Sequence, residues 1–170
     1  MSENSLRLRG KVAAVLGDNV NTDLIYPGRF LNITDRAMTA EHLFELACPD
    51  LRGQIRPGDF LVAGKNFGCG SSREQATAAV KYAGVGAVIA ASFARIFYRN
   101  SINLGLPLVV SKPALSKLRP GDKTEIDLAA GIIRNLTTGE SIEAAPLDPR
   151  AVELLEAGGL IPYLRQKHAA

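Results

Sequence analysis

Short apolar runs and amphipathic stripes follow one another along the chain. Mostly apolar runs bounded by Gly, Pro or Asp predict strands at 11–16, 60–63, 86–91 and 107–110, with the first and third buried. Apolar positions three and four residues apart predict helices at 72–83 and 93–104, with Ile96 and Phe97 on the apolar side of the second. Strand and helix therefore alternate, which favours an α/β fold with an at least partly parallel sheet and right-handed crossovers.

The segment between the first two strands has a different pattern. Residues 17–32 are rich in Asn, Asp, Gly and Pro, which predicts a loop with several turns. Thr39 is a candidate N-cap for a short helix at 40–47, and Pro49 would end that helix.

The last third of the chain predicts a hairpin and a helix. Apolar and polar residues alternate at 124–128 and 132–136, on either side of a short turn. A C-terminal helix is expected at about 149–157. Because no repeat or long linker divides the sequence, we expect a single domain over residues 1–170, with its core at about 11–145.

Composition excludes several functional classes. The chain has 170 residues, of which 46% are hydrophobic, as in an ordinary globular domain. It carries no membrane-length apolar run and no secretory pattern, so no membrane partner is expected. A net charge of +3 without a basic stripe argues against nucleic-acid binding. The two cysteines, Cys48 and Cys69, and two histidines lack metal-ligand spacing, which predicts no metal site and fits the reducing cytoplasm.

The segment richest in chemistry is GKNFGCGSSRE, residues 64–74. Its three glycines allow tight turns and close approach to a ligand, and a predicted helix follows at once. The free amides and dipole of a helix start attract anions, and Arg73 adds a planar fork for a carboxylate or phosphate. Ser71 lies at the mouth of this positive site, where neighbouring amides and a guanidinium would stabilise its alkoxide.

The same residues allow a purely structural interpretation. Ser71 and Glu74 have the spacing of a capping box, in which the serine only satisfies an unpaired amide at the helix start. Neither a Walker phosphate loop nor a dinucleotide fingerprint is present. The residues alone leave the cap and the anion site both open.

Three separated motifs carry a family resemblance. GKNFGCGSSREQA resembles the serine motif of the aconitase superfamily's swivelling domain, GDNVNTD at 17–23 resembles its opening loop, and SFARIFYRNS at 92–101 is similar to its third motif. The resemblance implies a swivelling β/β/α domain with a mixed, partly parallel sheet flanked by helices. Since the domain stands alone here, the chain looks most like the archaeal-type small subunits of isopropylmalate isomerase and homoaconitase.

The resemblance also implies an activity. A 4Fe–4S cluster on a large-subunit partner would act as the Lewis acid on a small carboxylic-acid substrate. Ser71 matches the catalytic serine that removes a proton α to a carboxylate, and Ser72 and Arg73 match substrate-binding positions. Thr22 and Asp23 match active-site positions in the opening loop. Two cysteines cannot hold a cubane cluster, so no cofactor is expected on this chain.

Substrate choice depends on the segment Phe30, Leu31, Asn32 and Ile33, which aligns with the family's specificity loop. Asn32 stands where homoaconitase-like members tend to place arginine, so an isopropyl group suits this loop better than an extra carboxylate. The first hypothesis is interconversion of 2-isopropylmalate and 3-isopropylmalate in leucine biosynthesis. The alternatives are the small subunit of homoaconitase or of a citraconate or dimethylmalate hydratase and, from another class, a stand-alone anion-binding regulatory module.

Overall fold

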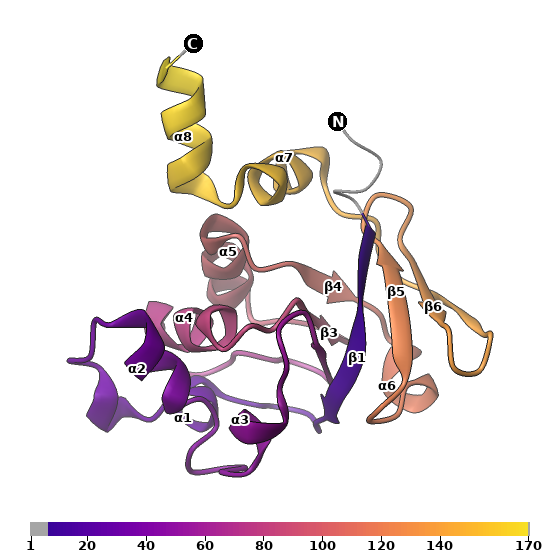
Figure 1. Ribbon diagram of the computed structural model, residues 1–170, viewed down its shortest axis with the longest axis horizontal. Coiled ribbons are helices and arrows are strands. Elements are labelled where there is room, and N and C mark those ends of the chain that lie inside the picture. Colours follow the sequence, from indigo (N-terminus) through magenta and orange to yellow (C-terminus); the bar gives the residue numbers. More distant parts are fainter. Residues whose placement is uncertain (1–6, 170) are drawn as a thin grey trace.

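A mixed sheet with seven strands organises the computed structural model, which describes residues 7–169 (Figure 1). The strand order is β4-β3-β2-β1-β5-β6-β7. The strands are β1 Arg7–Val15, β2 Phe60–Ala63, β3 Ala87–Ala90, β4 Leu108–Val110, β5 Lys123–Asp127, β6 Ile132–Asn135 and β7 Ser141–Glu143. The first four run parallel to their neighbours, whereas β1 pairs antiparallel with β5, and β5, β6 and β7 continue antiparallel. The expected mixed, partly parallel α/β sheet is confirmed.

Helices cover both faces of the parallel half of the sheet. Every residue of β2 and β3 is buried, as expected for strands covered on both sides. Leu61 and Val88 pack with the helices on one face, and Phe60 and Ile89 belong to a second core on the other. The helices are α1 Thr22–Ile25, the 3-10 helix η2 Gly28–Phe30, α2 Arg36–Glu41, α3 Leu51–Gln54, α4 Glu74–Tyr82, α5 Arg95–Leu104, α6 Ala114–Lys117, α7 Pro149–Ala157 and α8 Leu160–Ala169.

Several element boundaries differ from the sequence predictions. The helix expected at 40–47 with Thr39 as its cap is wrong, because α2 begins at Arg36 and ends at Glu41. Its cap is Asp35, whose Oδ1 accepts a hydrogen bond of 2.9 Å from the Met38 amide. Thr39 instead lies inside the helix and donates its hydroxyl to the Asp35 carbonyl.

Two elements near the C-terminus were not expected from the sequence. Strand β7 buries a single side chain, Ile142, so it has no recognisable apolar run. Helix α8 buries none of its residues and projects from the body in Figure 1. It follows Gly158 and Gly159 directly, and its Pro162 lies in the first turn, where proline is tolerated. None of the described helices is both long and apolar enough to cross a membrane.

A charge network ties β1 to the antiparallel half of the sheet. The buried Glu125 on β5 accepts hydrogen bonds from Arg9 Nε at 2.6 Å and from Arg134 Nη1 at 3.0 Å. Arg9 and Glu125 are register partners, so the pair joins β1 to β5, and Arg134 extends it to β6. The hydrogen bonds from Arg9 and then Arg134 hold the pKa of Glu125 below its ordinary value.

This network predicts an acid-dependent loss of stability. Because the pKa of Glu125 is lower in the folded chain than in the unfolded one, its contribution is present above the ordinary pKa of 4.5 and is lost as the pH falls through the lowered value. Glu125→Gln should lower the melting temperature at neutral pH. It should also flatten the decline of the melting temperature between about pH 5 and 3. The reason is that the variant takes up at most about one proton fewer on unfolding than the wild type does.

Thermal unfolding at a series of pH values checks this prediction. Glu143→Gln on β7 is the matched control, because Glu143 is exposed and has no ion pair with any of residues 7–169. The same slope in wild type and Glu125→Gln would contradict the assignment.

Candidate active site

The opening loop and the serine loop run side by side at one edge of the sheet. The Gly68 amide donates to the Val20 carbonyl at 2.8 Å, and the Thr22 amide donates to the Cys69 carbonyl at 2.8 Å. Asn21 and Cys69 form a parallel bridge, so these loops extend the pairing of β1 with β2. Two of the three sequence motifs are therefore in direct backbone contact.

The third motif supports the serine loop from its other side. The amides of Asn66 and Phe67 donate to the hydroxyl and the carbonyl of Ser92, at 2.8 and 3.0 Å. The rings of Phe67 and Phe97 meet edge to face with their centroids 5.3 Å apart. Gly68 lies against Phe97 with φ at +84°, so a Cβ there would overlap the aromatic ring. Glycine is required at this point both for its conformation and for its size.

A pocket of about 260 Å³ opens where the three motifs meet. The predicted residues Thr22, Ser71, Ser72 and Arg73 line it. The rest of its lining is Gly68, Gly70, Ala94, Arg95, Ile96, Phe97 and Asn100. Ile96 was expected on the apolar side of its helix, but it is 52% exposed and forms part of the pocket wall instead.

Thr22 fixes the backbone beneath the serine. Its side chain is buried, and its hydroxyl donates to the Ser71 carbonyl at 2.9 Å. Ser71 and Ser72 are exposed, and the Ser71 hydroxyl has no hydrogen bond to any of residues 7–169. The main chain of Ser71 is thus held while its hydroxyl remains available to a ligand.

The capping-box interpretation of Ser71 is wrong. Helix α4 begins at Glu74 rather than at Ser72, and its N-cap is Arg73, which makes no side-chain capping bond. Gly70, with φ at +93°, turns the chain before the serines, and they precede the helix instead of closing its first turn. Ser71 therefore lines the pocket just before the N-cap of α4.

Arg73 is one of two arginines that line the pocket, and Arg95 is the other. The Arg73 guanidinium forms an ion pair with Asp23 of the opening loop. The Arg73 side chain is only 19% exposed, whereas the Asp23 side chain is 63% exposed. Gly28 leaves room for this guanidinium, because a Cβ there would lie 3.3 Å from Arg73 Nη1. The guanidinium is held in place and already engages a carboxylate.

The predicted specificity segment lies outside this pocket. Phe30 stacks on His42, with ring centroids 3.7 Å apart and planes 11° apart. Arg29 lies over the Phe30 ring at 4.7 Å and pairs with Glu45 at 3.7 Å, and His42 Nδ1 is 2.9 Å from the same carboxylate. Leu31 and Asn32 are exposed and Ile33 is half-buried. The segment is anchored through its first residue, and the next three remain accessible.

Sequence reasoning missed two kinds of residue. Nothing in the sequence indicated that His42, which is half-buried at the C-terminal end of α2, stacks on Phe30. Arg95 and Asn100 line the pocket without having been singled out. The third motif contains both, so their presence in a recognised motif was the signal that could have found them.

The cysteines do not form a metal centre. Cys48 is exposed and Cys69 is partly exposed. Across residues 7–169, no group of three or more Cys, His, Asp or Glu side chains could hold a metal ion. A cubane cluster takes three or four thiolates, so these donors do not fit one.

Comparison with known proteins agrees with the fold and the motifs. The family model of the aconitase C-terminal domain matches residues 2–113, and the chain belongs to this family. It is 52% identical over 151 residues to the 3-isopropylmalate dehydratase small subunit of Moorella thermoacetica, covering 89% of this chain and 91% of that one. It is 51% identical over 156 residues to the methanogen homoaconitase small subunit of Methanothermobacter thermautotrophicus, covering 92% and 89%.

A solved structure has the same architecture. The crystal structure of 3-isopropylmalate dehydratase from Methanocaldococcus jannaschii matches with a TM-score of 0.89 and 41% identity, covering 96% of each chain. The expected aconitase-type swivelling fold is confirmed.

Gly68→Ala should lower the free energy of unfolding more than Gly139→Ala does, although both place alanine in the left-handed region. Alanine in the left-handed region costs about 1–2 kcal/mol, and overlap with Phe97 adds about 1–3 kcal/mol. Gly139 is the matched control, because its φ is +82° and a Cβ added there would have nothing within 4 Å. Denaturant unfolding should show the larger loss in Gly68→Ala; equal losses would mean that Phe97 moves aside freely.

Proposed function

We propose that the chain is the small subunit of a heteromeric hydro-lyase that interconverts 2-isopropylmalate and 3-isopropylmalate by dehydration and rehydration in leucine biosynthesis. One observation carries the proposal: an unbonded Ser71 hydroxyl lies beside Arg73 at the start of α4, in a pocket shared with Thr22. The relatives from Moorella thermoacetica and Methanothermobacter thermautotrophicus are both small subunits, which supports a large-subunit partner.

The chemistry requires a component that this chain lacks the donors to bind. We assign the iron–sulfur cluster of the aconitase family to the large subunit, where it would supply the Lewis acid. The present chain would contribute the base and part of the carboxylate site. Such a division gives each subunit an incomplete set of catalytic groups.

Ser71 is the proposed base. To remove a proton from the carbon α to a carboxylate, a serine must act as an alkoxide, which is unstable in water without assistance. The amides at the start of α4 and the Arg73 guanidinium would stabilise the negative oxygen. The bond from Thr22 to the Ser71 carbonyl would keep the hydroxyl directed at the substrate carbon.

Arg73 and Ser72 are the proposed carboxylate ligands. The pairing of Arg73 with Asp23 supports this role, because a carboxylate of the opening loop already reaches the guanidinium. Asp23 is mostly exposed, so a substrate carboxylate could take its place while Asp23 turns to solvent. From the same opening loop, Thr22 would thus hold the backbone of Ser71, and Asp23 would pair with Arg73.

The surroundings of the specificity segment support an apolar substituent. A substrate with an additional carboxylate would need a free cation near Phe30–Ile33, and two arginines flank this segment. Arg29 is engaged by Glu45 and the Phe30 ring. Arg36 lies over the Tyr82 ring at 4.9 Å and lines a different pocket, away from this segment. Leu31 and Asn32 offer no charge, which favours the isopropyl group over a carboxylate chain.

Reconstitution tests the proposal. The chain should co-purify with the cluster-binding large subunit of its source organism when both are expressed anaerobically. The complex should convert isopropylmalate with a higher kcat/KM than homocitrate, citraconate hydrate or dimethylmalate. A preference for homocitrate would assign the homoaconitase function instead. Failure to form a complex, together with anion binding by the chain alone, would point to a regulatory module.

Ser71→Ala in the reconstituted complex should lower kcat by about 10²-fold or more, the scale of a lost proton-transfer group. Complex formation should persist, since the side chain makes no hydrogen bond within residues 7–169. Ser116→Ala is the matched control, because its exposed hydroxyl only contacts the Pro113 carbonyl at 3.1 Å. Steady-state assays with both variants separate the roles, and near-wild-type turnover in Ser71→Ala would exclude the serine as the base.

A further inference from the structure

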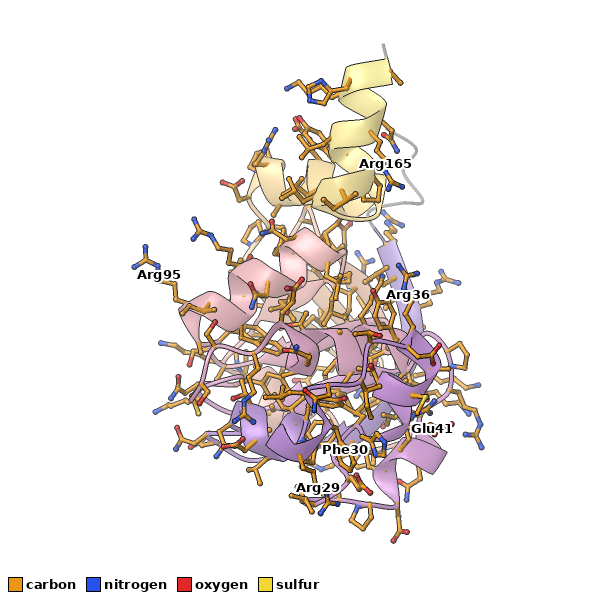
Figure 2. The ribbon with its side chains drawn as sticks, turned by 90° about the vertical axis from the view of Figure 1, so that its left-hand side faces the viewer. Arg29, Phe30, Arg36, Glu41, Arg95 and Arg165 are labelled. Atoms are coloured by element: carbon orange, nitrogen blue, oxygen red, sulfur yellow. The ribbon has the colours of Figure 1, made fainter. Side chains whose placement is uncertain are left out.

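A second pocket lies near the C-terminal end of α4, away from Ser71. It has a volume of about 370 Å³ and lies among helices α2, α4, α5 and α8. Its lining is Arg36, Lys81, Tyr82, Asn103, Leu104, Gly158, Ile161, Pro162 and Arg165. Three of these residues are cationic and none is Asp or Glu. Figure 2 shows Arg36 and Arg165 on the same side of the molecule, on α2 and α8.

Lys81 is the cation held most firmly in this pocket. It lies in the last turn of α4 and is half-buried, and its Nζ donates to the Gly105 carbonyl at 2.9 Å. Burial lowers the pKa of Lys81, and no carboxylate among residues 7–169 pairs with it. One neutral carbonyl therefore accounts for its hydrogen bonding, and two of its three donors remain for a ligand.

The other two cations flank Lys81 and have no carboxylate partner either. Arg36 lies over the Tyr82 ring, which orients its guanidinium without neutralising it. Arg165 is exposed on α8, and neither arginine forms an ion pair within residues 7–169. Three unpaired positive charges around one concave site raise the local concentration of anions.

We propose that this pocket binds a small organic anion carrying at least two acidic groups. Lys81 would bind one acidic group from within, and the forks of Arg36 and Arg165 would bind the other from the rim. Leu104, Ile161 and Pro162 provide an apolar wall for a short hydrocarbon body. The acidic groups can be carboxylates or a phosphate, since both match a guanidinium fork.

The ligand would connect α8 to the rest of the domain. No residue of α8 is fully buried, and the helix packs on α5 and α7 only through the partly buried side chains of Leu160 and Tyr163. An anion held by Arg165 on α8, Lys81 on α4 and Arg36 on α2 would join three separate helices. Because it binds only where these helices are together, it should also raise the stability of the folded chain.

Titration of the full-length chain with citrate and, separately, with inorganic phosphate at constant ionic strength tests the proposal. Amide NMR signals of Lys81, Gly105 and Arg165 should shift and saturate with at least one probe, and comparison of the two affinities identifies the preferred acidic group. Lys81→Met should weaken this binding by about tenfold or more, the effect of losing a charge-assisted contact.

Control variants separate this pocket from the Ser71 pocket and from general charge effects. Arg73→Met should leave the shifts at Lys81 and Arg165 intact, and so should Lys112→Met, which removes an exposed lysine elsewhere. If Lys81→Met does not fold, Arg165→Gln at the exposed rim serves in its place, with the same expected loss. Shifts confined to Ser71 and Ser72, linear titrations with both probes, or wild-type affinity in the substituted pocket would each overturn the proposal.

Discussion

The site depends on the close approach of two loop backbones that glycine makes possible. Gly68 donates to Val20 and packs against Phe97 at a φ of +84°, and the Cys69 carbonyl accepts the Thr22 amide. Any side chain at residue 68 would push the serine loop away from α5 or from the opening loop. The positions of Ser71, Thr22 and Arg73 all follow from this contact, because their own side chains make few other bonds.

The topology of the sheet explains why three distant motifs meet. Strands β1, β2 and β3 are adjacent and parallel, so their carboxyl ends lie at one edge of the sheet. The opening loop follows β1, the serine loop follows β2 and the third motif follows β3. The adjacent parallel strands thus bring together polar loops at 17–23, 64–74 and 92–101, which are well separated in the sequence. The antiparallel half, tied on through Glu125, contributes no residue to the Ser71 pocket.

What could be predicted from the sequence was what local patterns encode. The apolar runs predicted β2 at its observed bounds, and the hairpin of β5 and β6 to within one residue at each end. Prediction of the helix N-caps failed at Asp35 and at Ser71. At Ser71 it failed because the capping pattern does not reveal the backbone turn at Gly70. Thr22 contacts Ser71, and His42 contacts Phe30. The periodicity of the sequence indicates neither of these pairings. Motif resemblance predicted that Thr22 and Ser71 belong to one active site but not the hydrogen bond between them, and it gave no sign of the contact between His42 and Phe30.

The ion pair between Arg73 and Asp23 neutralises the arginine when no other carboxylate is bound. A guanidinium that is only 19% exposed has lost much of its hydration, so it needs a partner in the free protein. Asp23 provides that partner but remains 63% exposed, and it can regain water when another carboxylate arrives. The proposed exchange would keep one carboxylate on Arg73 throughout, so the buried charge would never be left unpaired. Binding would then favour a substrate whose carboxylate matches the fork better than a surface aspartate does.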